Sequence, residues 1–410
     1  MGNWRDVEFG KIPREWDYLP IDKIKSDDRR AIAMGPFGSN IKAENFVEKG
    51  IPVIRGTNFN QYKYIGGEFV YLTEIKADEL IGSNCRAGDL VFTHRGTIGQ
   101  VGLVPYGKYH RYVISQSGMK LTVNQSVMNS EYLFYFFFSK YGQYQILKYE
   151  SQVGVPSISN PLTSLKEIEV PVPPLPEQRA IAGVLSSLDD KIDLLHRQNQ
   201  TLEALAQTLF RQWFVEEAEE DWEEKSLDGI ADFLNGLACQ KFPPKNDVDK
   251  LPVLKIKELR GGISDASDWA STDISDEYII HNGDVIFSWS GSLLVKIWDG
   301  EDCILNQHLF KVTSSEYPKW FYYFWTKSHL QKFSMIAESK STTMGHIKRS
   351  DLSSSMVLIP SPEELKLIDE IIAPMIDKLI VNGQQIRTLE KLRDTLLPRL
   401  MSGEVRVQQK

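Results

Sequence analysis

Apolar residues recur along one stretch of the chain at alternating steps of four and three, and the same spacing returns 187 residues later. The first stripe consists of Ile181, Leu185, Leu188, Ile192, Leu195, Asn199, Leu202, Ala206, Leu209 and Trp213. The second consists of Ile368, Ile372, Met375, Leu379, Asn382, Ile386, Leu389, Arg393, Leu396 and Leu400. A 3.5-residue period held this long is typical of a coiled-coil seam. We therefore predict two long helices that pack on each other through these stripes.

The order of segments along the chain sets the direction of these helices. If each helix follows one of two related globular modules, the second helix must run back toward the first module, so the pair is antiparallel. A pseudo-two-fold axis at the middle of the seam then places Asn199 opposite Asn382. The two amides would satisfy each other and fix the register at some cost in stability. The same pairing sets Leu188 against Arg393, which we expect at a more hydrated edge.

The length of the helices suggests a spacing role. From Ile181 to Trp213 a helix would extend about 50 Å at roughly 1.5 Å per residue. One turn of duplex DNA spans about 34 Å. A helix pair of this length would suit two sites about one turn, or somewhat more, apart on a duplex.

The globular halves share short framework segments in the same order. The matching pairs are Ile51–Arg55 with Leu251–Lys255, Gly88–Thr93 with Gly283–Ser288, Ser115–Gln116 with Asn306–Gln307, and Tyr132–Ser139 with Trp320–Thr326. Short β-branched runs with Gly-Asp turns predict strands, and the aromatic runs predict short buried helices or strands. We predict an α+β module used twice, with divergent segments that contact different things. The expected organisation is a first module (1–168), a helix (169–215), an acidic linker (216–228), a second module (229–357) and a C-terminal helix (358–404).

Negative charge is concentrated in one segment. Residues 216–228 contain eight acidic side chains and one lysine, in a chain whose net charge is −8. Residues 1–168 instead carry 20 Lys and Arg against 17 Asp and Glu. The acidic run predicts a solvated linker. Because binding depends on the local field, the net charge neither indicates nor excludes a nucleic-acid partner.

Composition also bears on location. The first residues are polar and charged, so we expect no signal peptide, and no apolar run approaches the length of a membrane span. Cys85, Cys239 and Cys303 are isolated, with neither disulfide nor metal-site spacing. We expect a cytoplasmic protein with no membrane partner.

No catalytic motif is found in the sequence. It lacks the Asn-Pro-Pro-aromatic and Asp-Pro-Pro-aromatic tetrads of amino-methyltransferases, and the Gly35–Gly38 turn lacks phosphate-loop spacing. The seven histidines form no metal-ligand cluster with the cysteines. We therefore predict a protein that is not an enzyme and has no cofactor or metal of its own.

The chain as a whole resembles the specificity subunits of type I restriction–modification systems. The resemblance rests on Val172–Ile181, Asp190–Ile192, Leu396–Val405, Gly88–Phe92 with Arg95-Gly96, and Ile51–Asn58, and above all on their duplicated order. It implies two target-recognition domains, each reading one half of a bipartite, asymmetric site in double-stranded DNA. It further implies that the helices set the unread spacer and dock two modification methyltransferase subunits, through which restriction subunits join.

Candidate DNA-contacting residues are donors for phosphates or base edges that follow the predicted strands. In the first module they are Arg55, Asn58, His94, Arg95, Thr97, His110, Arg111, Ser151 and Gln152. In the second they are Gln240, Lys241, Lys255, Lys257, Ser288, Trp289, Ser290, Ser341, Thr342 and Thr343.

Each candidate has a structural alternative. The arginines could pair with nearby acids, His94 could be a satisfied buried histidine, and Trp289 could belong to the core. Gln116 and Gln307, shared by both modules, are more simply framework residues.

Two other functions stay open at the level of the sequence. One is a protein-binding adaptor whose modules do not bind DNA sequence-specifically. The other is an enzyme with an unrecognised motif, which binding of S-adenosylmethionine to the isolated chain would support. Salt dependence separates the adaptor from a DNA-binding protein, because phosphate contacts make affinity fall as salt rises.

Overall fold

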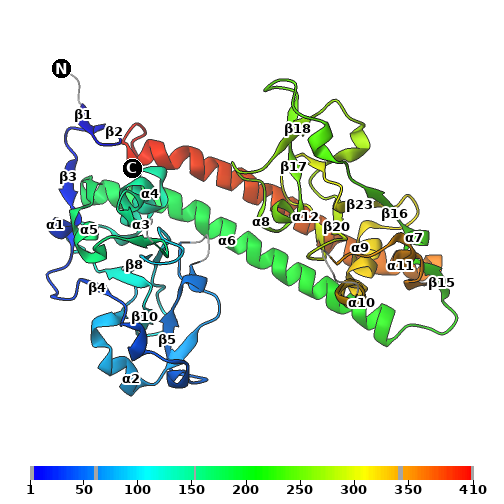
Figure 1. The fold of residues 1–410 in the computed structure, drawn as a ribbon, viewed down its shortest axis with the longest axis horizontal. Helices are drawn as coiled ribbons and strands as arrows, with labels where there is room; N and C mark the ends of the chain where they lie inside the picture. Colours follow the sequence, from blue (N-terminus) through cyan, green and yellow to red (C-terminus); the bar gives the residue numbers. More distant parts are fainter. Residues whose placement is uncertain (1–3, 60–62, 152–153, 340–344, 408–410) are drawn as a thin grey trace. The chain divides into compact units, whose positions relative to one another are not determined.

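The computed structural model describes residues 4–59, 63–151, 154–339 and 345–407. The chain divides into two compact units: unit 1 contains residues 1–193 and 389–410, and unit 2 contains residues 194–388. Each unit has its own sheets and includes a segment of each of two long helices, α6 (Leu175–Arg211) and α12 (Pro362–Met401) (Figure 1). Within the described ranges, no helix is long and apolar enough to cross a membrane.

Unit 1 is built on two four-stranded sheets, ordered β4-β11-β8-β9 and β6-β5-β10-β7. The first contains β4 (Ile32–Met34), β11 (Gly118–Leu121), β8 (Leu90–Thr93) and β9 (Val101–Leu103). The second contains β6 (Val70–Leu72), β5 (Ile51–Ile54), β10 (Tyr112–Ile114) and β7 (Asn84–Cys85). Strand β5 pairs with β10 in parallel, and the other pairs in these sheets are antiparallel.

Shorter elements complete unit 1. Its two-stranded sheets pair β1 (Trp4–Val7) with β2 (Gly10–Pro13), β3 (Asp17–Pro20) with β14 (Glu169–Val172), and β12 (Glu150–Ser151) with β13 (Ser157–Ile158). Its short helices are α1 (Ile21–Ile24), α2 (Glu74–Glu79), α3 (Ser130–Phe138), α4 (Lys140–Leu147) and α5 (Pro161–Glu167).

Unit 2 repeats this arrangement with the strand orders β16-β23-β20-β21 and β18-β17-β22-β19. The strands are β16 (Asp232–Asn235), β23 (Leu309–Thr313), β20 (Val285–Ser288), β21 (Leu294–Ile297), β18 (Trp269–Ser271), β17 (Lys250–Leu254), β22 (Cys303–Leu305) and β19 (Ile279–Ile280). The short helices are α7 (Leu227–Ile230), α8 (Ile256–Gly261), α9 (Lys319–Ser328), α10 (Leu330–Ser339) and α11 (Arg349–Ser353). Strand β17 pairs in parallel with β22, as β5 does with β10. The predicted α+β fold with an internal repeat is confirmed.

The two aromatic runs form helices α3 and α9, which lie in the cores of their units. The side chain of Asn129 caps α3 by accepting a hydrogen bond from the backbone amide of Tyr132. Both helices bury almost every side chain, including Phe134 and Trp320. A helix that is apolar on all sides is stable only when it is surrounded, so these runs form the centres of the two cores.

Every position of the two predicted stripes is buried or partly buried. In unit 2, Nδ2 of Asn382 donates to Oδ1 of Asn199 at 2.9 Å, and Nδ2 of Asn199 donates to the carbonyl of Leu379 at 3.2 Å. Oδ1 of Asn382 is buried without a partner among the described residues. The predicted meeting of Asn199 and Asn382 is confirmed, but the two amides do not satisfy each other, because the Asn199 amide donates to backbone and leaves Oδ1 of Asn382 without a donor.

In unit 1 the helix segments are also antiparallel, because Ile181 of α6 shares a core with Leu400 of α12 while Asp189 pairs with Arg393 at 3.0 Å. The side chain of Arg393 is only 12% exposed and lies over the Phe138 ring. The expectation that Arg393 marks a hydrated edge is wrong, since a buried carboxylate and a ring surround it.

The acidic segment is only partly a linker. Glu223–Ser226 form β15, which pairs antiparallel with β24 (Met356–Ile359), and α7 begins at Leu227. Lys225 holds this strand to the unit through hydrogen bonding with the Tyr317 hydroxyl at 3.0 Å. The second half of the predicted linker 216–228 thus belongs to the sheet structure of unit 2, with its acidic side chains directed to solvent.

Candidate nucleic-acid interface

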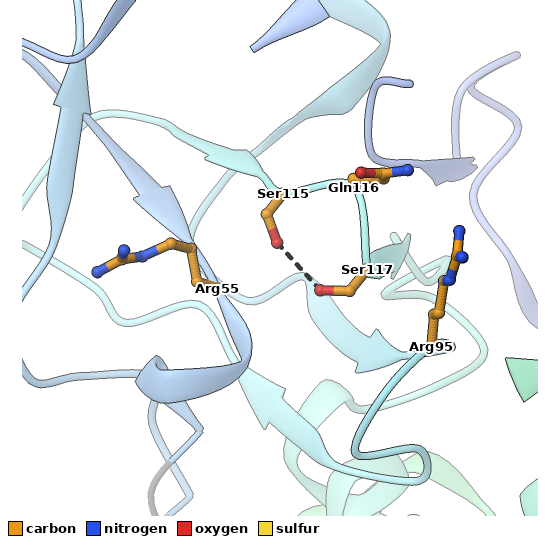
Figure 2. A pocket seen from close by; sticks show the side chains of 5 residues that line it. All are labelled: Arg55, Arg95, Ser115, Gln116 and Ser117. Carbon is orange, nitrogen blue, oxygen red and sulfur yellow. Dashed lines mark hydrogen bonds between the residues drawn. The ribbon is translucent and has the colours of Figure 1, made fainter. Parts of the chain in front are cut away.

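Three strand ends meet at one edge of unit 1. Because β5 and β10 are parallel, Arg55 and the Ser115–Ser117 turn leave their strands on the same side, and Arg95 follows β8 nearby. These residues line a pocket of about 400 Å³ that is open to solvent (Figure 2). The Ser115 and Ser117 hydroxyls are 3.3 Å apart at its centre, with an arginine on each side. We name these five residues, Arg55, Arg95, Ser115, Gln116 and Ser117, the unit 1 lip.

The two arginines of the unit 1 lip are available for a ligand. Neither Arg55 nor Arg95 forms an ion pair with any residue in the described ranges, and Nε of Arg55 is buried without a hydrogen-bond partner. A buried donor that lacks a partner is costly in the free protein. Guanidinium groups pair bidentately with phosphate or with the O6 and N7 atoms of guanine. The lip therefore presents donors suited to a nucleic acid.

Several predicted contact residues of unit 1 have structural roles instead. Asn58 is fully buried; it accepts from the Arg55 amide and donates to the carbonyls of Gly66 and Glu68, which shapes the turn η3 (Gly56–Asn58). Its predicted DNA contact conflicts with this burial.

His94 and Arg111 also have protein partners. His94 is buried, its Nε2 lies 3.1 Å from the carbonyl of Gln116, and burial lowers the pKa of its imidazole below the usual range. Arg111 forms ion pairs with Glu74 and Asp78 of α2. A DNA contact by Arg111 would require these pairs to break.

The remaining unit 1 candidates are more accessible. Thr97 and His110 are exposed, and Ser151 is partly buried in β12. His110 lies 3.9 Å from Glu74. Gln152 lies outside the described residues.

The equivalent edge of unit 2 carries different side chains. Lys255 follows β17, Trp289 and Ser290 follow β20, and His308 stands where unit 1 has Ser117. Oγ of Ser290 lies 3.1 Å from Nδ1 of His308, whose Nε2 lies 3.3 Å from Nε2 of Gln307. We name these five residues, Lys255, Trp289, Ser290, Gln307 and His308, the unit 2 lip.

Burial again separates the candidates of unit 2. Ser288 is fully buried and donates to the carbonyls of Ser290 and Ser292, so its predicted DNA contact conflicts with its position. Lys255 is ion-paired with Asp268, whereas Trp289 donates to Asn235 at 3.1 Å and its ring lies against Phe310.

The other unit 2 candidates lie on the surface or outside the described ranges. The exposed ones are Gln240, Lys241 and Lys257. Those outside the described residues are Ser341, Thr342 and Thr343.

Some lip residues were missed or misinterpreted at the level of the sequence. Ser117 and His308 were not predicted, although they directly follow the shared Gln116 and Gln307 and differ between the modules. A residue that differs between the modules directly after a glutamine that both modules share could have indicated a contact position. Gln116 was interpreted as framework, yet its side chain is exposed in the lip, because the turn that carries it projects from the end of β10.

In each unit, a glycine packs closely against the backbone of the lip. A Cβ at Gly35 would lie 1.8 Å from the carbonyl oxygen of Ser115, and one at Gly236 would lie 2.3 Å from that of Asn306. The two glycines follow the equivalent strands β4 and β16. The close approach of backbone to backbone at both places requires glycine.

Replacing Gly35 by alanine is therefore expected to displace the Ser115–Ser117 turn and to destabilise unit 1 by about 2 kcal/mol, as overpacking of a close contact does. Urea unfolding of the purified chain measures this loss. Gly183→Ala is the control, since a Cβ at that exposed helical position meets no atom within 4 Å. Equal unfolding midpoints for the Gly35→Ala variant and the parent would contradict the close contact.

The described residues contain no group of three or more histidine, cysteine or acidic side chains placed to hold a metal ion. The three cysteines are buried and unpaired. Burial raises the pKa of the Cys85 and Cys239 thiols, which keeps them protonated.

Comparison with known proteins shows which family the sequence matches. The family described as "Type I restriction modification DNA specificity domain" matches residues 38–204 and 219–391, so its two copies cover most of the chain. The chain is 27% identical to the type I restriction enzyme MjaIX specificity subunit of Methanocaldococcus jannaschii, over 99% of this chain and 97% of that protein. It is 20% identical to the EcoKI specificity subunit of Escherichia coli, over 98% of this chain and 92% of that protein.

A solved structure shares the fold. The S subunit of a type I restriction–modification system from M. genitalium superposes with a TM-score of 0.58 at 16% identity, covering 94% of this chain and 96% of that one. At this identity the likeness supports the fold of the two units and not the roles of individual residues.

Proposed function

The chain belongs to the family of type I restriction–modification DNA specificity proteins, and we propose that its two lips read the two halves of a bipartite, asymmetric DNA site. One observation carries this proposal: the strand framework around the lips is the same in both units, whereas the side chains presented differ. The equivalent positions are Arg55 and Lys255, and Ser117 and His308, while the exposed Arg95 of unit 1 corresponds to the buried Ser290 of unit 2. A shared framework with divergent contacts fits one fold that reads two different sequences.

We also propose that α6 and α12 set the length of the unread DNA between the two half-sites. The same helices would dock two methyltransferase subunits, through which restriction subunits join. A row of exposed residues on α6 lies outside the seam and includes two leucines. It consists of Leu194, Gln198, Thr201 and Leu205. The positions 187 residues later on α12 are Val381, Gln385, Thr388 and Leu392, and they are exposed as well. We name these two sets the α6 stripe and the α12 stripe.

The geometry of the stripes supports docking. Steps of four, three and four residues place all members of a stripe on one face of a helix, over about 16 Å. Leu205 and Leu392 are 46% and 45% exposed. Neither seam packing nor the cores of the units explain why this exposed pattern is repeated. A repeated surface fits two copies of one partner.

Catalysis is proposed to belong to the partner subunits, since the sequence lacks the Asn-Pro-Pro-aromatic and Asp-Pro-Pro-aromatic tetrads of amino-methyltransferases. We also propose a cytoplasmic location, which the three unpaired cysteines support.

Replacing Arg55 by alanine is the experiment that tests the lip directly. We expect the chain in complex with its methyltransferase to lose about 10- to 100-fold in affinity for its DNA site and to relax its base preference in one half-site only. Arg111→Ala is the control, because Arg111 is already ion-paired within unit 1. Fluorescence anisotropy with labelled duplexes over a salt titration measures both.

The alternative function, a protein-binding adaptor, gives a different result. In that case the Arg55→Ala variant and the parent would bind duplex DNA equally, and binding would not weaken as salt rises.

A further inference from the structure

An exposed aromatic ring stands beside the unit 1 lip. Phe37 is 82% exposed and belongs to none of the apolar core clusters of the described chain. It lines a cavity of about 510 Å³ together with Arg95, Gln116 and Asn40. Arg95 and Gln116 also line the lip pocket, so the two cavities lie on either side of the same two residues.

The backbone that carries Phe37 is held in place. The amide of Gly35 donates to the carbonyl of Gly118 at 2.8 Å, and the amide of Asn40 donates to the carbonyl of Phe37 at 2.8 Å. A Cβ at Gly38 would lie 2.6 Å from Oε1 of Gln116, so the turn is pressed against the lip on this side as well. The ring is thus presented from a fixed turn, which lowers the entropy lost when it binds a ligand.

Among the described residues, the corresponding turn of unit 2 carries no ring. Its turn after β16 runs Gly236-Leu237-Ala238-Cys239, and alignment of Gly236 with Gly35 places Ala238 at the position of Phe37. Trp289, the aromatic residue of the unit 2 lip, is packed against Phe310 and donates to Asn235. An exposed ring on this turn is therefore a difference between the two units.

We propose that Phe37 inserts at, or stacks on, one base step of the half-site that unit 1 reads, and so selects for a step that unstacks easily. This inference rests on the proposed function of the lip. An apolar ring beside unpaired arginines suits a duplex, because the arginines hold the backbone while the ring opens a step. Steps that unstack easily, such as pyrimidine–purine steps, are then preferred without a hydrogen bond to their edges.

The test uses the full chain in complex with its methyltransferase and duplexes that carry the DNA site selected by the parent complex. 2-Aminopurine, whose fluorescence rises when it unstacks, replaces one base at a time in both half-sites. Apart from any position where the methyltransferase extrudes its target base, which every variant should keep, the parent is expected to raise fluorescence at one further step of one half-site. Phe37→Ala should abolish that further signal and weaken binding about tenfold. Phe37→Trp should retain both.

Ile75→Ala is the matched control, because Ile75 is an apolar residue of unit 1 that is 75% exposed and lines neither cavity. It should behave as the parent does. An identical fluorescence pattern and affinity for Phe37→Ala and the parent would overturn the inference while leaving the lip proposal intact. Failure of the parent to select any two-part site would overturn the lip proposal, and this inference with it.

Discussion

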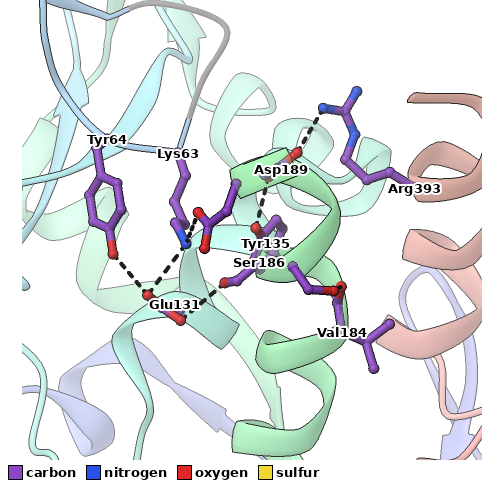
Figure 3. Close-up of polar contacts among 10 residues, drawn as sticks. Lys63, Tyr64, Glu131, Tyr135, Val184, Ser186, Asp189 and Arg393 are labelled. Carbon is purple, nitrogen blue, oxygen red and sulfur yellow. Dashed lines mark hydrogen bonds and ion pairs between the residues drawn. The ribbon is translucent and has the colours of Figure 1, made fainter. Parts of the chain in front are cut away.

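Replacing Asp189 by leucine is expected to destabilise unit 1 by about 3 kcal/mol. The largely buried Arg393 would then keep only the exposed Asp394 as an ion-pair partner. Asp189 joins α6, α12 and α3: it pairs with Arg393 at 3.0 Å and accepts from the Tyr135 hydroxyl at 2.7 Å (Figure 3). The side chains of Asp189 and Arg393 are 11% and 12% exposed. Burial, with the nearby carboxylate, raises the pKa of Tyr135, so its hydroxyl stays protonated and donates.

The rest of this network should limit how far the loss spreads. Lys63, which is 4% exposed, lies 3.2 Å from Asp190 and 3.6 Å from Glu131 (Figure 3). These contacts connect α6 to α3 and to the segment before β6 without involving Asp189. The destabilisation should therefore come from the uncompensated guanidinium of Arg393 and from the Tyr135 hydroxyl that loses its acceptor.

Urea unfolding, followed by hydrogen exchange of the α6 and α12 amides in unit 1, measures this effect. The double variant Asp189→Leu with Arg393→Met should recover most of the loss, since removing both charges leaves no unpaired ion. Asp377→Leu, at an exposed position of α12, should change stability by no more than about 0.5 kcal/mol. A double variant as unstable as the single one would show that the pair is not what stabilises this contact.

The second large effect is expected at the repeated stripes. Leu205→Asp should remove one methyltransferase subunit from the complex, and Leu205→Asp with Leu392→Asp should remove both. An aspartate placed in an apolar contact costs more than about 2 kcal/mol, or over 30-fold in affinity. Native mass spectrometry of the co-expressed complex measures the expected series of two, one and no methyltransferases per chain.

Gln200→Asp is the matched control for the stripes. Gln200 is exposed on α6, and five residues of helix place it well away from the face that carries Leu205. It should retain two methyltransferases. If the double stripe variant also retained two, the exposed repeat would have to serve something other than docking.

The scaffold could be predicted from sequence because its signals are periodic and occur twice. The seam positions, the meeting of Asn199 with Asn382 and the strand framework all follow from spacing and repetition. Arg393 could not be predicted correctly, because its environment comes from Asp189, beside the seam, and from Phe138, in another element. A seam pattern indicates which positions face inward but not which neighbours meet a charge there.

The individual contact residues were less predictable. Asn58 and Arg55 both suit DNA contact by residue type, and only the fold shows that the Asn58 amide completes a turn while the Arg55 guanidinium has no ion-pair partner in the described ranges. Arg111 pairs with Glu74, which lies 37 residues away. Likewise, the acidic strand β15 pairs with β24, more than a hundred residues along the chain. Local composition does not indicate partners that are so distant in the sequence. The charge of residues 216–228 therefore predicted a linker where the structure has a strand.

The two lips are proposed to read two different DNA sequences held at one spacing. The decisive experiment is selection from random duplex DNA by the chain in complex with its co-expressed methyltransferase, followed by sequencing of the retained duplexes. We expect two short, unlike blocks separated by one fixed gap, and we expect the gap to shorten or lose definition when seven residues are deleted from both α6 and α12. A complex that assembles yet retains no common sequence would contradict the claim and would favour a protein-binding adaptor.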